Sequence, residues 1–111
     1  MEILDRRIQK TMVKHVILWS LRDDLTGAEK ESAKLGIKTS LEALQGKIQG
    51  LINIKVNING LETSTADVML DSSFESAEAL ASYSKHPAHV AAADKFVRPF
   101  TKSRSCLDFE E

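Results

Sequence analysis

Three histidines, one tyrosine and one cysteine are the side chains of this sequence best suited to acid–base or nucleophilic chemistry. Two of the histidines, His86 and His89, lie in the segment His-Pro-Ala-His, and Tyr83 precedes the second by six residues. An imidazole exchanges protons near neutral pH because its ordinary pKa is about 6.5. A phenol can donate a hydrogen bond to an oxyanion that develops while a base removes a proton. Tyr83 and His89 therefore form a candidate pair for proton abstraction, provided that folding brings them together.

Each of these residues also has a structural interpretation. Because Pro87 suits the first turn of a helix, His86 would stand at the cap position and His89 would only pack. His15, in a strand-like segment, points either into the same cavity as the helical histidines or into the core. A metal site of the three histidines has no supporting cysteine or carboxylate spacing. Cys106 carries no nucleophile signature, which favours a packed strand residue.

Length, charge and hydropathy narrow the class of protein. The 111 residues suit one domain, expected over residues 12–111 after an N-terminal extension of residues 1–11. The net charge of −1, with both signs interspersed, argues against a nucleic-acid partner. The longest apolar runs are far shorter than the ~20 residues of a membrane span. A single cysteine excludes an internal disulfide, so a cytoplasmic location is the default expectation.

The first half of the chain predicts a strand, a helix and a second strand. Residues 13–21 are rich in β-branched and aromatic side chains, which is typical of a buried strand. Thr26 and Glu29 form a T-x-x-E capping box, and apolar residues then recur every three or four positions, which predicts a helix over residues 26–46. In residues 52–59 aliphatic and polar side chains alternate strictly, so Ile52, Ile54, Val56 and Ile58 are expected on one face of a strand.

The second half repeats this alternation of elements. Asn59-Gly60 indicates a turn, and a strand is expected to start over residues 66–70. Residues 77–81 predict a short helix, which Pro87 interrupts before a second piece over residues 88–97 that ends at Pro99. Residues 105–109 alternate again as a last strand. The order βαββαβ predicts an α+β, ferredoxin-like fold with a four-stranded antiparallel sheet and the helices on one face. Because the other face is left uncovered, a second copy is expected to pack on it.

The sequence resembles the stress-responsive A/B barrel (Dabb) domain family over nearly its whole length, from about Met12 to Phe109. The segments that carry the resemblance are Val13-Lys14-His15-Val16, Gly46-Lys47-Ile48-Gln49-Gly50-Leu51, Phe74-Glu75-Ser76, Tyr83, His86-Pro87-Ala88-His89, Ser103-Arg104-Ser105 and Asp108-Phe109. The resemblance implies a homodimer in which two sheets close into a dimeric α+β barrel. It further implies no cofactor, apart from a Mg²⁺ ion that the backbone carbonyls of Gln45, Ile48 and Leu51 would hold at the end of the first helix.

Two hypotheses for the function follow. Most members of the family look like stress-associated proteins without an assigned reaction. This implies a barrel dimer without catalytic activity, which is stress-associated or binds a small apolar or carbonyl-containing ligand. One plant branch is a cofactor-free polyketide cyclase. The resemblance of this sequence to that branch implies that His89 is the general base and Tyr83 the oxyanion donor. It also implies that His15, Tyr83 and His86 line the substrate pocket. A cavity of roughly 300 Å³ or more that both His89 and Tyr83 face would favour a ligand site.

Overall fold

The fold was analysed in a computed structural model that describes residues 12–111. The predicted extension, residues 1–11, lies outside the described residues. The elements are β1 (Val13–Leu21), α2 (Gly27–Glu42), β2 (Leu51–Asn57), β3 (Val68–Phe74), α3 (Ala77–Lys85), α4 (Pro87–Ala92), the π-helical turn η1 (Ala93–Val97), the 3₁₀ turn η2 (Arg98–Phe100) and β4 (Thr101–Glu110). None of the helices in this part of the chain is long and apolar enough to cross a membrane.

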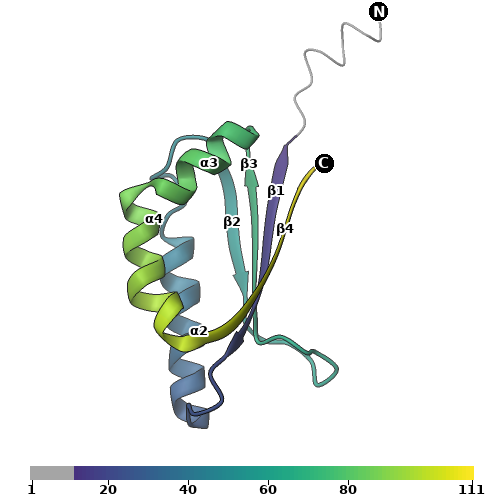
Figure 1. The fold of residues 1–111 in the computed structure, drawn as a ribbon, viewed down its shortest axis with the longest axis vertical. Coiled ribbons are helices and arrows are strands. Elements are labelled where there is room, and N and C mark those ends of the chain that lie inside the picture. Colours follow the sequence, from purple (N-terminus) through teal and green to yellow (C-terminus); the bar gives the residue numbers. More distant parts are fainter. Residues whose placement is uncertain (1–11) are drawn as a thin grey trace, which may run out of the picture.

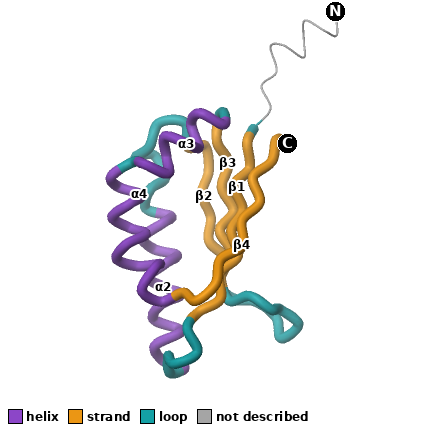
Figure 2. Tube along the Cα trace, in the orientation of Figure 1, coloured by secondary structure: helices purple, strands orange, loops and turns teal. Residues whose placement is uncertain are grey.

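The four strands form one antiparallel sheet in the order β2-β3-β1-β4. Helix α2 and the α3–α4 segment cover one face of this sheet and leave the other face bare (Figure 1). The helical layer and the sheet are distinct in Figure 2, where the connection between β2 and β3 extends away from both. The predicted ferredoxin-like βαββαβ arrangement is thereby confirmed.

The core lies between the sheet and the helices because both contribute apolar side chains to that layer. The odd-numbered residues of β1 are buried against the helices, among them Ile17, Trp19 and Leu21. Helix α2 contributes Ala33, Ile37 and Leu41, which follow the predicted helical spacing. The sheet thus has an inner face toward the helices and an outer face that the chain itself does not cover.

Helix α2 starts as predicted and ends earlier than predicted. The capping box is present, since the Glu29 amide donates to Thr26 Oγ1 at 3.1 Å and the Thr26 amide donates to Glu29 Oε1 at 2.8 Å. The helix ends at Glu42 rather than at residue 46. Leu44 and Ile48 are nevertheless buried, in the turns that follow. Their helix-like spacing therefore arises because both side chains pack into the core, although the helix has already ended.

The strict alternation predicted for residues 52–59 is wrong at its first position. The pairing of β2 with β3 shifts register between Leu51 and Asn53, which inserts an extra residue as in a β-bulge. Leu51 is consequently buried and Ile52 is 41% exposed, whereas Ile54 and Val56 are buried as predicted.

Three other boundaries differ from the prediction. Strand β3 begins at Val68 rather than at residue 66. Strand β4 runs from Thr101 to Glu110 rather than over the predicted residues 105–109. Helix α3 runs to Lys85, four residues beyond the predicted end. The predicted break at Pro87 is confirmed, but helical turns continue through Pro99 because a proline fits the first turn of a 3₁₀ segment.

Candidate ligand-binding site

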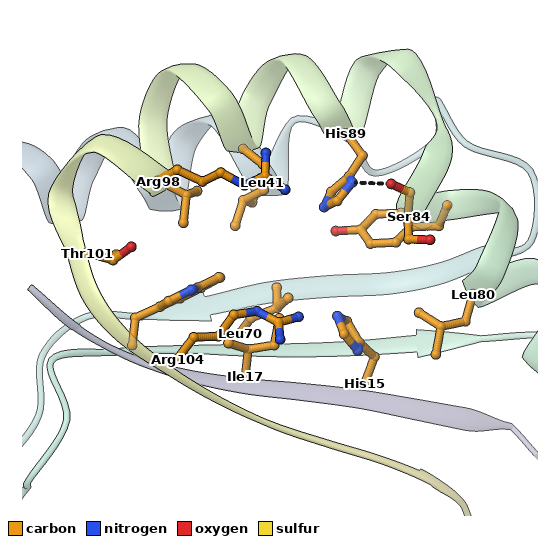
Figure 3. A pocket seen from close by; sticks show the side chains of 14 residues that line it. His15, Ile17, Leu41, Leu70, Leu80, Ser84, His89, Arg98, Thr101 and Arg104 are labelled. Carbon is orange, nitrogen blue, oxygen red and sulfur yellow. Dashed lines mark hydrogen bonds between the residues drawn. The ribbon is translucent and has the colours of Figure 1, made fainter.

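A cavity of about 150 Å³ lies between the inner face of the sheet and the α3–α4 side of the helical layer. In Figure 3, Ile17, Leu70 and His15 form its floor on the sheet, and Leu41, His89 and Arg98 approach from the helices. The lining combines apolar side chains with polar ones, and Thr101 and Ser84 add hydroxyl groups to it. Such a mixture is typical of small-molecule sites, in which apolar walls bury the ligand and a few polar groups orient it.

Tyr83 is the most deeply buried polar residue of this cavity, with 1% of its surface exposed. Its ring centroid lies 4.8 Å from that of Phe74 and 4.3 Å from that of His89. Its hydroxyl is buried and has no hydrogen-bond partner among residues 12–111. Burial raises the pKa of Tyr83 well above its usual range, because the phenolate would be poorly solvated there. The side chain is therefore a hydrogen-bond donor at every working pH.

His89 is half-buried on α4, and one of its ring nitrogens is already engaged. Nδ1 lies 3.3 Å from the carbonyl oxygen of Ser84, which can only accept, so Nδ1 carries the hydrogen (Figure 3). Desolvation by burial lowers the pKa of His89, and the positive charges of Arg98 and Arg104 lower it further. The neutral ring then keeps a lone pair on Nε2. Nε2 of His89 is thus able to accept a proton or a hydrogen bond.

The break at Pro87 is what brings Tyr83 and His89 together. In an uninterrupted α-helix, two residues six positions apart point about 120° apart around the axis. Here α3 ends at Lys85, His86 adopts an extended conformation, and α4 begins at Pro87 in a new direction. The two rings consequently stack at a tilt of 39°.

His15 faces the same cavity from β1, as one of its two interpretations predicted. It is buried, and its ring centroid lies 6.2 Å from that of Tyr83. Its Nδ1 lies 2.5 Å from Oδ1 of Asp108, which is its direct neighbour across the β1–β4 ladder. Since an ionised carboxylate only accepts, Nδ1 of His15 donates to it. Asp108 therefore orients the His15 ring, a role that sequence reasoning missed.

Cys106 and Asp108 also bring possible metal ligands to His15. The nitrogen, sulfur and oxygen atoms of the three side chains lie within 4.8 Å of one another. The Nδ1–Oδ1 separation of 2.5 Å is that of a hydrogen bond. Two ligands of a tetrahedral zinc ion would stand about 3.3 Å apart. Cys106 is exposed in the single chain and not packed as predicted, and its thiol donates to Oδ1 of Asp108 at 3.4 Å. Partial desolvation and the Asp108 carboxylate raise the pKa of the Cys106 thiol, which favours this hydrogen-bonded thiol over a thiolate ligand.

The structure does not bring His86 into the cavity. Its Nδ1 accepts a hydrogen bond of 3.0 Å from the Ala88 amide, and its own amide donates to the Tyr83 carbonyl. His86 thus ends α3 and caps α4, and it is not among the residues that line the cavity. Nδ1 of His86 is thus engaged by the cap of α4 and not by the cavity.

Gln45, Ile48 and Leu51, the residues expected to hold a cation, lie on the connection from α2 to β2. The Ile48 carbonyl accepts the Leu51 amide at 3.2 Å, which leaves its second lone pair for another partner. The Gln45 side chain bridges to the strand, since its Nε2 donates to the Ile52 carbonyl at 2.8 Å. The turn thus has hydrogen bonds of its own, and none of the three residues is among those that line the cavity.

Two arginines that sequence reasoning did not single out complete the lining. Arg98 comes from the helical side and Arg104 from β4, where it pairs with Trp19 across the ladder (Figure 3). In the sequence Arg104 stands out only within the segment Ser103-Arg104-Ser105, which carries the family resemblance, and by its place in an alternating strand. That signal acquires meaning only once the register of β4 against β1 is known.

The size of the cavity differs from the expectation. At about 150 Å³ it is half of the roughly 300 Å³ expected for a typical ligand site. A dry apolar cavity of about this volume accepts a molecule as large as benzene. His89 and Tyr83 both line this cavity, and their rings also pack against each other. The geometry therefore suits a ligand about one ring in size, and a larger one would have to extend through the mouth.

Comparison with known proteins places this architecture in a family. A family model described as the stress responsive A/B barrel domain matches residues 13–111. A dimeric protein of unknown function with a ferredoxin-like fold, from Bacteroides fragilis, is 37% identical with a TM-score of 0.84, and the match covers 90% of this chain and 96% of that one. No functionally curated protein matches the sequence.

Two other solved structures share the fold at lower identity. The Arabidopsis thaliana protein At3g17210 is 26% identical with a TM-score of 0.66, over 89% of this chain and 94% of its own. A Dabb family protein from Mesorhizobium loti, with a TM-score of 0.68, is 17% identical over 90% of this chain and 96% of its own, which shows the fold alone. With the family model matching every described element, the chain belongs to the stress-responsive A/B barrel domain family.

Proposed function

We propose that this protein binds a small, partly apolar molecule that carries a hydrogen-bond acceptor, in the cavity lined by Tyr83 and His89. The observation that carries the proposal is the buried Tyr83 hydroxyl without a partner among the described residues. A buried donor left unpaired costs about 1–3 kcal/mol. A ligand carbonyl or oxyanion that accepts from this hydroxyl would recover that free energy on binding.

A catalytic role is the second candidate, and the protonation of the two side chains favours it. The lowered pKa of His89 leaves a lone pair on Nε2, and the raised pKa of Tyr83 keeps its proton. In this reaction Nε2 of His89 takes a proton from the carbon next to a ligand carbonyl. The electron pair of the broken C–H bond moves to the carbonyl oxygen, and the resulting enolate accepts a hydrogen bond from Tyr83. No cofactor is required for such a step.

Acetophenone is a suitable probe, because it has one ring, one carbonyl and exchangeable methyl protons. Trp19, the single tryptophan of the chain, lines the cavity, so its fluorescence reports binding there. We expect saturable acetophenone binding by the wild type, and affinity about tenfold lower in Tyr83→Phe. Ethylbenzene, which lacks the acceptor, should bind equally to both. Wild-type fluorescence that never saturates with either probe would contradict the binding site.

Proton exchange separates binding from catalysis. In D₂O, the methyl protons of bound acetophenone should exchange faster with the wild type than with His89→Gln, as followed by proton NMR. His86→Asn is the matched control, since it removes a histidine that does not line the cavity and replaces it with a side chain that can still cap α4. Binding without accelerated exchange would leave the protein as a ligand-binding member of its family and remove the catalytic role.

We further propose that the protein is a homodimer that pairs through the outer face of the sheet and forms an α+β barrel. This face carries an apolar patch of Val16, Leu18, Met69, Leu107 and Phe109, which the strand register places side by side. Leu107 is 64% and Leu18 43% exposed in the single chain. The Bacteroides fragilis protein, 37% identical, is described as dimeric. A stable monomer in light scattering at micromolar concentration would contradict this assembly.

Three smaller expectations belong to the same proposal. The single cysteine accords with a reducing compartment, and hence with a cytoplasmic location. Residues 12–111 are proposed as the functional domain, with residues 1–11 as an extension. A Mg²⁺ ion on the carbonyls of Gln45, Ile48 and Leu51 stays a prediction, and it would stabilise the turn after α2 through the negative end of that helix.

A further inference from the structure

The charges that line the cavity are all of one sign. Among its lining residues Arg98 and Arg104 are cations, and there is no aspartate or glutamate. The chain as a whole has a net charge of −1, so this concentration of positive charge does not follow from composition. A cavity with apolar walls and a cationic rim favours a ligand with an apolar body and an anionic group.

The two arginines differ in how far they are already neutralised. Arg98 forms an ion pair with Asp94, one helical turn before it, and both side chains are about 60% exposed. Arg104 has no carboxylate within ion-pair distance among residues 12–111. Asp108, on the same strand, is occupied by His15 at 2.5 Å. Arg104 is therefore the group with the most unused capacity to bind an anion.

The arginines and the Tyr83–His89 pair occupy different parts of the cavity. Figure 3 shows Thr101 at one end and Ser84 and His89 at the other, and the side chain of Arg98 extends from the Thr101 end over Leu41 toward the middle. The guanidinium of Arg104 comes from the sheet side. An arginine fork matches a carboxylate with two parallel hydrogen bonds, so it fixes orientation as well as charge. An elongated ligand would then direct its carboxylate to the arginines and its carbonyl to Tyr83 and His89.

We propose that the ligand of this site is a small oxo-carboxylate, with the carboxylate bound by Arg104 and assisted by Arg98. This inference rests on the proposed function, because it uses the same cavity and adds the charge of the ligand. Arg104 is a specificity-determining residue in this assignment, since it selects the anion without touching the reacting carbon.

The test compares three probes that share one ketone. Acetophenone has no second polar group, 4-acetylbenzamide carries a neutral amide opposite the ketone, and 4-acetylbenzoate carries a carboxylate there. With Trp19 fluorescence as the signal, we expect 4-acetylbenzoate to bind the wild type about tenfold more tightly than 4-acetylbenzamide. The preference should shrink as salt is added, because salt screens charges at an exposed rim.

Arg104→Gln should abolish the preference for the carboxylate, so that 4-acetylbenzoate and 4-acetylbenzamide bind this variant with equal affinity. Lys102→Gln is the matched control, because it removes one positive charge from the same strand outside the cavity. That variant should keep the tenfold preference. If the wild type binds 4-acetylbenzoate and 4-acetylbenzamide equally well and still binds acetophenone, the carboxylate assignment is overturned and the proposed function stands. If none of the probes binds, both proposals fail.

Discussion

The rings of Tyr83 and His89 lie 4.3 Å apart, centroid to centroid, across the break between α3 and α4. The contact joins a permanent hydrogen-bond donor to a half-buried imidazole that favours its neutral form. Because His86 caps α4 with its own ring, the orientation of His89 depends on a residue that does not enter the cavity. The pair is thus a product of the helix break as much as of the two side chains.

Tyr83→Phe should leave the free energy of unfolding unchanged or raise it by up to about 1 kcal/mol. The hydroxyl that it removes is buried and has no partner among the described residues, so no hydrogen bond is lost. Tyr83→Ala should lower that free energy by about 3–5 kcal/mol, because it empties a core site. Urea denaturation of the two variants checks the prediction. A loss above about 1 kcal/mol in Tyr83→Phe would mean that the hydroxyl is bonded in the free protein.

Stability should fall with acidification in a way that depends on His89. Burial lowers its pKa in the folded protein below the ordinary value of 6.5, so the unfolded chain binds the proton more readily. This contribution is fully present above pH 6.5 and is lost as the pH falls through the folded pKa. The free energy of unfolding should therefore drop more in the wild type than in His89→Gln between about pH 7.5 and pH 5.5. If the free energy of unfolding falls equally with pH in the two proteins, the lowered pKa of His89 is contradicted.

Gly50→Ala should destabilise the protein more than Gly46→Ala. Both glycines have positive φ, 88° and 82°, and therefore share the strain that a side chain brings to this conformation. At Gly50 an added Cβ would also lie 2.5 Å from Cβ of Ala79 on α3, whereas nothing lies within 4 Å at Gly46. We expect a loss of about 1 kcal/mol at Gly46 and clearly more at Gly50, measured by thermal and urea unfolding. Equal losses would show that α3 moves away without cost.

Leu107→Lys should weaken the proposed dimer at least about tenfold, since burying a lysine in an apolar contact is costly. Leu107 pairs with Val16 on the outer face of the sheet. Leu35→Lys is the matched control, because Leu35 is another exposed leucine, at 57%, and belongs to α2. Light scattering after size exclusion should show monomer for the first variant and wild-type mass for the second. The same mass for both would place the interface elsewhere.

The prediction of the fold from the sequence succeeded where the signals are local. The capping box of Thr26 and Glu29, the apolar spacing of α2 and the break at Pro87 each depend on residues within one or two turns. The alternation of β1 and the order βαββαβ then limited the topology to a ferredoxin-like sheet with one bare face. The same local signals misplaced the end of α2, because buried turn residues such as Leu44 and Ile48 imitate helical spacing.

The candidate site was predicted only as a set of residue types. Tyr83, His89 and His15 were identified from the chemistry that they can perform, and their assignment to a pocket came from a resemblance to a family. His86 was expected in the pocket, and in the structure its ring serves the cap instead. Arg104 and Asp108 were noted only in segments that carry the family resemblance and were not assigned to the site, because only the register of β4 against β1 brings them there.

The sequence by itself determined the elements, their order and the bare apolar face, because these depend on short-range propensity and periodicity. The tertiary structure alone decided which side chains meet. The β1–β4 register sets Asp108 beside His15 across 93 positions of sequence, and the change of direction at Pro87 turns His89 onto Tyr83. Contacts of this kind depend on strand pairing and helix direction, which act over the whole chain.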